Sequence, residues 1–90
     1  MENYEIEIKG DSKIYKCTLR EPGFEELSMA MTAMRMNSGK VNEAKGGKFI
    51  VESCWIDGDD EILTNGKLLF TASLRAASLI SAFEVDLKKK

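Results

Sequence analysis

Two stretches near the N-terminus alternate apolar and polar side chains. The alternation covers residues 4–9 and, after the polar turn Gly10-Asp11-Ser12, residues 15–19. A repeat of two places every apolar side chain on one face of a strand, so the pattern predicts a β-hairpin with one apolar face. An isolated hairpin is marginally stable in water. Helices or a partner must therefore cover this face.

After the hairpin, from Pro22 onward, the apolar residues recur at the spacing of a helix. Pro22 suits the first turn of a helix, where its missing N–H is not needed. Leu27, Met31 and Met34 follow at a spacing of three to four residues and predict a stripe that faces the core. The polar residues 37–39 are expected to end this first helix.

A second helix is predicted over residues 41–56, although the sequence FIVESCW within it would also suit a buried strand. Gly47 in this segment could allow close packing of two helices. The acidic run 57–60 should break the chain, residues 61–64 could form one further helical turn, and Asn65-Gly66 is typical of a turn.

The last helix is predicted from a heptad-like spacing of apolar residues. Its seam consists of Leu69, Ala72, Ala76, Leu79, Phe83 and Leu87. This length is under three heptads, which favours packing in a small bundle over a freestanding coiled coil. The whole chain is therefore expected to be one α+β domain over residues 1–90, an N-terminal β-hairpin followed by about three helices packed as a small bundle.

Composition narrows the classes of function. The formal net charge of -2 argues against a nucleic-acid partner, because phosphate neutralisation requires a basic surface. No stretch has the roughly 20 apolar residues of a membrane span, and MENYEIEIKG does not resemble a secretory signal. A cytoplasmic protein without a membrane or nucleic-acid partner is expected, with Cys17 and Cys54 as small buried thiols in a reducing compartment.

The residues that carry catalysis or bind metals do not form a convincing site. The chain has no histidine, which excludes Ser-His triads and Cys/His zinc sites. DGDDEILTNGKL begins like a calcium-binding EF-hand loop, but Ile62 stands where that loop needs glycine and Leu68 where it needs glutamate. GGKF resembles part of a phosphate loop, yet Asn42 and Phe49 replace its first glycine and its hydroxyl residue. We expect no enzyme, cofactor or metal site.

Apolar side chains that could bind a protein partner are the remaining candidates. Methionine surfaces adapt to varied partner helices, and tryptophan is common at interface centres. Burial in a small core is the competing interpretation for each of them. The candidate partner-binding residues are Met29, Met36, Trp55, Leu69, Leu79 and Phe83.

Two longer motifs support a family resemblance. A strand that ends in TLREPGFEEL, then KFIVESCWIDGDDEI, then a helix rich in leucine and alanine is similar to small tail assembly chaperones of bacteriophages and prophages. The resemblance extends over nearly the whole chain. It implies that Arg20, Glu21 and Pro22 are structural: a strand end and a helix start, where Arg20 could form a brace with a carboxylate.

The resemblance also implies a function. Such chaperones are thought to coat the helical tape measure protein while tail subunits polymerise, and they are absent from the finished tail. The expected partners are thus a tape measure protein or tail subunits, and the chain could form a homo-oligomer. Two alternatives stay open: a structural virion component such as a tail or head completion protein, and a small enzyme or metal-binding domain.

Overall fold

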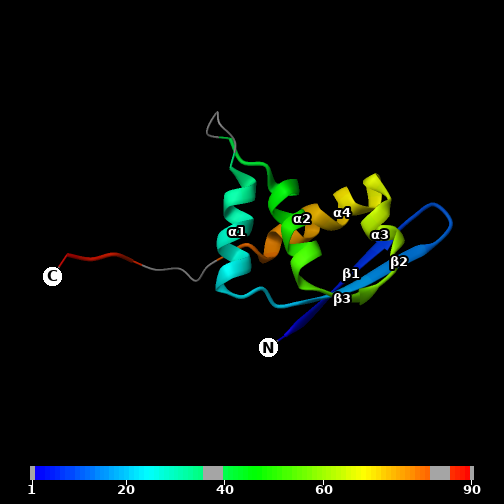
Figure 1. Cartoon of the computed structure of the whole chain (residues 1–90), viewed down its shortest axis with the longest axis horizontal. Helices are drawn as coiled ribbons and strands as arrows, with labels where there is room; N and C mark the ends of the chain where they lie inside the picture. Colours follow the sequence, from blue (N-terminus) through cyan, green and yellow to red (C-terminus); the bar gives the residue numbers. More distant parts are fainter. Residues whose placement is uncertain (1, 36–39, 82–85, 90) are drawn as a thin grey trace.

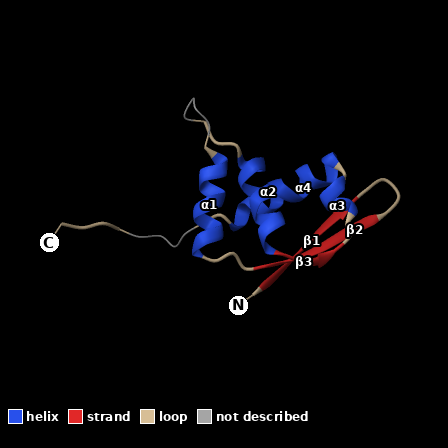
Figure 2. Ribbon diagram, in the orientation of Figure 1, coloured by secondary structure: helices blue, strands red, loops and turns tan. Residues whose placement is uncertain are grey.

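The chain folds as a three-stranded antiparallel sheet with helices against it, which confirms the predicted α+β class (Figures 1 and 2). The computed structural model describes residues 2–35, 40–81 and 86–89. The elements are β1 (Asn3–Lys9), β2 (Ile14–Arg20), α1 (Phe24–Met34), α2 (Glu43–Cys54), β3 (Trp55–Gly58), α3 (Glu61–Thr64), α4 (Gly66–Ala76) and the short 3-10 helix η1 (Ala77–Leu79).

The predicted hairpin forms the larger part of the sheet. β1 and β2 pair along their full length, from Asn3 opposite Arg20 to Lys9 opposite Ile14, and the sheet order is β1-β2-β3. Tyr15 is half-buried, while Ile6, Ile8, Cys17 and Leu19 are buried on the inner face. The helices cover this face, as the alternation required.

The sequence pattern does not predict the third strand, because it places residues 55 and 56 in the second helix. The helix ends at Cys54, and Trp55 begins β3, where it pairs with Leu19 of β2. Gly58 has a φ of +148°, and a Cβ at this position would lie only 2.6 Å from the Cβ of Cys17. Only glycine fits so close to β2 in this conformation, so the chain can add an edge strand here.

The acidic run continues the sheet rather than forming a solvated turn alone. The Lys16 N–H donates to Asp59 Oδ2 at 2.8 Å, and the Asp59 N–H donates to the Lys16 carbonyl at 2.9 Å. Asn65 then caps α4, since its side chain accepts hydrogen bonds from the N–H groups of Lys67 and Leu68. α3 and the turn at Asn65 agree with the prediction.

α2 is the central helix, and it packs against both α1 and α4 (Figure 1). Gly46 lies under the Met34 side chain, and a Cβ at Gly47 would overlap the carbonyl oxygen of Ser73 on α4. The predicted role of Gly47 in close helix packing is confirmed. The buried core residues are Ile6, Ile8, Cys17, Leu19, Ala30, Ile50, Val51, Cys54, Ile62, Ala72 and Ala76.

α1 differs from its prediction in register. Its N-cap is Gly23, so Pro22 precedes the helix instead of lying in the first turn. The helix turns Ala30 into the core, and Met34 packs over Gly46 of α2. Met31 was expected in the core stripe but is 57% exposed, because it lies about 100° around the helix from Ala30.

The last helix is shorter than predicted. α4 ends at Ala76 and η1 at Leu79, and Ile80 has a non-helical backbone. Leaving the helix lets Leu79 and Ile80 pack against the core cluster. Leu87, the predicted end of the seam, is non-helical and fully exposed. Phe83 lies outside the described residues.

Candidate functional site

The outer side of α1 carries an apolar groove. Phe24, Leu27, Ser28 and Met31 recur at helical spacing and lie on one face of α1. Ile80 and Ser81, which follow η1, form the other wall. These six residues enclose about 420 Å³ and are called the α1 groove below.

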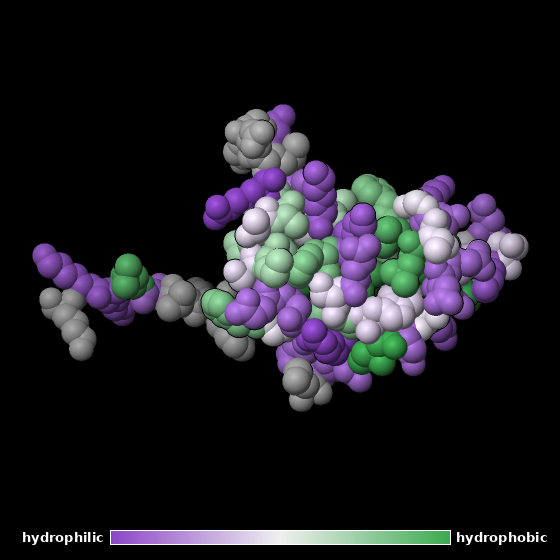
Figure 3. Space-filling model, in the orientation of Figure 1, coloured by the Kyte–Doolittle hydropathy of each residue, from purple (hydrophilic) through white to green (hydrophobic). Residues whose placement is uncertain are grey.

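The groove is exposed because α1 covers α2 with a different face. Ala30 is buried at the contact with α2, while Phe24 is 82% exposed and Met31 57% exposed. Apolar side chains reach the molecular surface where Figure 1 draws α1 (Figure 3). Single exposed apolar residues are common on soluble proteins, whereas a contiguous row along a helix is typical of an interaction surface.

A second hollow continues from the groove and shares Leu27 and Ser81 with it. Its other lining residues include Tyr4, Glu21 and Leu79. Glu21 and the exposed Glu25 place two carboxylates near the N-terminal end of α1, and α1 carries no Lys or Arg. This end of the apolar surface is therefore acidic.

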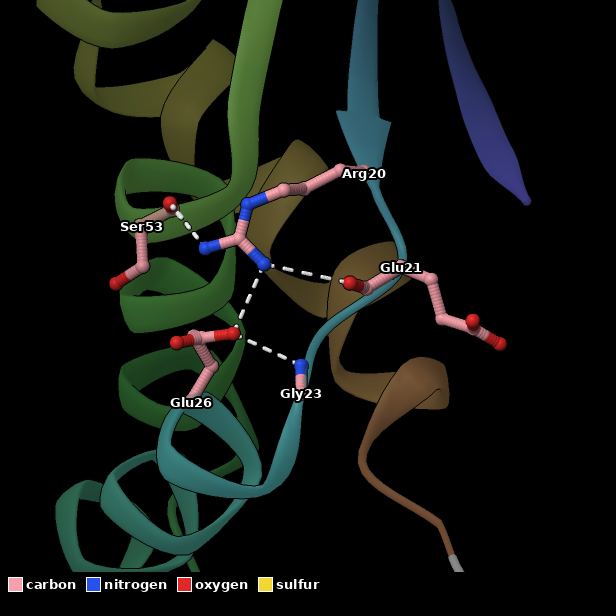
Figure 4. Close-up of polar contacts among 5 residues, drawn as sticks. All are labelled: Arg20, Glu21, Gly23, Glu26 and Ser53. Carbon is pink, nitrogen blue, oxygen red and sulfur yellow. Dashed lines mark hydrogen bonds and ion pairs between the residues drawn. The ribbon is translucent and has the colours of Figure 1, made fainter. Parts of the chain in front are cut away.

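Arg20 fixes the start of α1 and hence the position of the groove (Figure 4). Its Nη1 donates to Glu26 Oε1 at 2.9 Å and to the Glu21 carbonyl at 3.4 Å, and its Nη2 donates to the Ser53 carbonyl at 3.4 Å. The same Glu26 oxygen accepts a hydrogen bond from the Gly23 N–H at 2.8 Å. One guanidinium thus joins the end of β2, the first turn of α1 and the end of α2.

This brace shifts the titration of its carboxylate. The hydrogen bond from Arg20 and the one from the Gly23 N–H hold the pKa of Glu26 below its ordinary value. A charged Glu26 near the N-terminus of α1 also matches the helix dipole. The predicted Arg20–carboxylate brace is present, and Glu26 is its partner.

The partner-binding candidates from sequence lie in different places. Met29 is 54% exposed on another side of α1 and does not line the groove. Trp55, Leu69 and Leu79 are partly buried against the core, and Leu79 also lines the second hollow. Met36 and Phe83 lie outside the described residues.

None of the groove residues was among the partner-binding candidates: Leu27 and Met31 were expected to face the core, and Phe24 and Ile80 were not considered. Phe24 directly follows Pro22-Gly23, and its spacing to Leu27 and Met31 is helical. An apolar residue at the first position of a helix, in line with two others, was a usable signal for Phe24. Ile80 had no such signal, because its approach to α1 depends on where α4 ends.

The two thiols are buried and unpaired with each other. Burial raises the pKa of Cys17 and of Cys54 above the ordinary thiol value. Such thiols are poor nucleophiles. Over residues 2–35, 40–81 and 86–89, no three metal-ligating side chains of the His, Cys, Asp or Glu type come together. In the same ranges, no helix is both long and apolar enough to span a membrane.

Comparison of the chain with protein-family models, with curated protein sequences and with solved structures gives no significant match. The candidate site is therefore defined by the geometry of the α1 groove and its brace.

Proposed function

We propose that this protein is a non-enzymatic binding protein that holds an amphipathic helix of a partner in the α1 groove. The observation that carries the proposal is the row of apolar side chains on α1, with Phe24 and Met31 at its two ends, which no other described element covers. Amphipathic helices bind such grooves through anchors at a spacing of three, four and seven residues.

The groove suits a helix that is apolar on one face and basic at one end. Complete burial of a Phe or Met side chain contributes about 1.5–3 kcal/mol, so Phe24 and Met31 together could supply much of the affinity. Glu21 and Glu25 would attract Lys or Arg of the partner and would disfavour an acidic helix.

Within this class we propose a phage or prophage tail assembly chaperone that acts in the bacterial cytoplasm, with the tape measure protein as partner. The resemblance of the TLREPGFEEL and KFIVESCWIDGDDEI segments supports this role. The Arg20–Glu26 brace explains the first of these motifs physically. It fixes the path of the chain from the end of β2 to Phe24, the first residue of α1.

Co-expression with a long, helix-rich tape measure protein, the partner that the resemblance implies, tests the proposal. The complex would be analysed by size-exclusion chromatography with light scattering. Met31→Glu and Met29→Glu form a matched pair, because both residues are methionines of α1 and are similarly exposed, at 57% and 54%. Only Met31 lines the groove.

We expect the wild type and the M29E variant to co-elute with the long protein, and M31E to lose at least about tenfold in affinity. If M29E and M31E bound the long protein equally well, the α1 groove would be excluded as the binding site. Detection of this chain in purified virions would instead support the structural virion component, and a wild-type chain that elutes alone while the long protein precipitates would reject the chaperone role.

A further inference from the structure

One edge of β1 pairs with no other strand among residues 2–35, 40–81 and 86–89. The other edge pairs with β2. The hydrogen bonds that close the two ends of this ladder are Gly10 N–H to the Lys13 carbonyl, at 2.8 Å, and Glu21 N–H to the Glu2 carbonyl, at 3.0 Å. Both involve even-numbered residues on the β1 side. Hydrogen-bonded pairs alternate along an antiparallel ladder, so Glu5 and Glu7 direct their N–H and C=O groups away from β2.

A groove runs between this edge and α4. Its volume is about 590 Å³, and its lining residues are Glu5, Ile6, Glu7, Ile8, Phe70, Thr71, Leu74 and Arg75. Phe70 and Leu74 are one helical turn apart on α4, and they are 54% and 44% exposed. The edge thus combines free backbone groups with an apolar wall beside them.

We propose that β1 binds an extended segment of a partner protein, which adds to the sheet as a fourth strand. Backbone groups of Glu5 and Glu7 would supply the hydrogen bonds, as in other cases of strand addition. Alternate side chains of the added strand would point to the inner face and pack on Phe70 and Leu74. The remaining side chains would lie on the outer face, opposite the Glu5 and Glu7 carboxylates.

The carboxylates of Glu5 and Glu7 define the chemistry of this partner, and the exposed ion pair of Glu7 with Lys16 of β2, at 3.6 Å, leaves Glu5 as the stronger attraction. Opposite charges stabilise cross-strand pairs, so residues opposite Glu5 and Glu7 should be Lys or Arg. A segment that alternates apolar and basic residues therefore fits the edge. A second copy of this chain fits poorly. If all seven residues of β1 paired antiparallel with the β1 strand of another copy, Glu5 would lie opposite Glu7 of that copy, and like charges in opposite positions are destabilising.

This proposal goes beyond the proposed function, because the strand site and the α1 groove share no residue. The probe is a seven-residue peptide of alternating lysine and valine, titrated into the 15N-labelled full chain and followed by NMR. Two further peptides carry N-methyl groups, one on its lysine amides and one on its valine amides. If lysines lie opposite Glu5 and Glu7, only the lysine amides point toward β1.

We expect the parent and the valine-methylated peptides to bind and to slow amide exchange at Glu5 and Glu7. Methylation of the lysine amides should weaken binding on the order of tenfold or more, because it removes the hydrogen bonds to β1. The L74Q variant should lose affinity, while M29Q, a matched change on α1, should not. Equal affinity of the two methylated peptides, no binding of any peptide, or protection of Glu5 and Glu7 by self-association without peptide would each overturn the proposal.

Discussion

Gly47 is where α2 and α4 come closest, and a single methyl group there tests the packing of the helices. A Cβ at this position would overlap the Ser73 carbonyl oxygen and would lie 3.1 Å from the Ala77 backbone nitrogen. Both groups belong to backbone that cannot rotate away. The Gly47→Ala change therefore forces the two helices apart.

The net effect follows from two opposing contributions. Alanine is favoured over glycine inside a helix by about 1 kcal/mol. Overpacking of a core costs about 1–3 kcal/mol and sometimes more, and a clash with fixed backbone should exceed that range. We therefore expect a net loss of at least about 2 kcal/mol in the free energy of unfolding. In a domain of this size, a loss of about 2 kcal/mol corresponds to a fall of roughly 8–16 °C in Tm, and a larger loss to a larger fall.

Thermal and urea unfolding followed by circular dichroism would measure the change. Gly66→Ala is the matched control, because Gly66 is the first residue of α4 and a Cβ there meets no atom within 4 Å. This variant should be neutral or up to about 1 kcal/mol more stable. A Gly47→Ala protein that melts at or above the wild-type temperature would refute the close approach of α2 to α4.

Three further predictions concern buried or charged groups. Ser73 Oγ is buried and finds no hydrogen-bond partner among the described residues. Ser73→Ala should therefore raise the free energy of unfolding, measured by urea titration, by up to about 1 kcal/mol, and a lower free energy of unfolding would contradict this. Folding lowers the pKa of Glu26, mainly through the hydrogen bond from Arg20. The ionised Glu26 side chain therefore contributes fully to stability at pH values above its ordinary pKa of 4.5, and this contribution is lost as the pH falls through the lower pKa of the folded state. Glu26→Gln should thus lower Tm at about pH 7 but not at about pH 2, and an equal difference at both pH values would argue against the brace. Burial and the raised pKa of Cys17 and Cys54 predict slow reaction with an aromatic disulfide reagent until the chain is unfolded in urea, whereas rapid labelling of the native protein would contradict their burial.

Some elements could be predicted because their signals are local. The hairpin follows from strict alternation, and the start of α4 follows from Asn65, whose side chain caps the helix. The role of Gly47 was also predictable, since a glycine inside an otherwise good helix often marks a close contact. Trp55 was misassigned because FIVESCW satisfies both helical and strand patterns, and pairing with Leu19 decides between them.

The candidate sites were harder to predict than the fold class. The period of α1 shows that it has apolar residues on several sides, but which side is buried depends on where α2 lies. Met31 was therefore placed in the core, although it lines an exposed groove. The groove beside β1 also joins residues far apart in sequence, such as Ile6 and Phe70, and no local signal relates them.

The sequence by itself determined the α+β class, the hairpin and the close approach at Gly47, because periodicity and backbone sterics act over a few residues. It also contained the segment Arg20-Glu21-Pro22, in which the Arg20 side chain needs only a nearby carboxylate to form the brace. Tertiary structure decided which apolar residues are core and which are surface, where α4 ends, and which strand edge is free. These features depend on long-range packing, in which the burial of one face fixes the exposure of another.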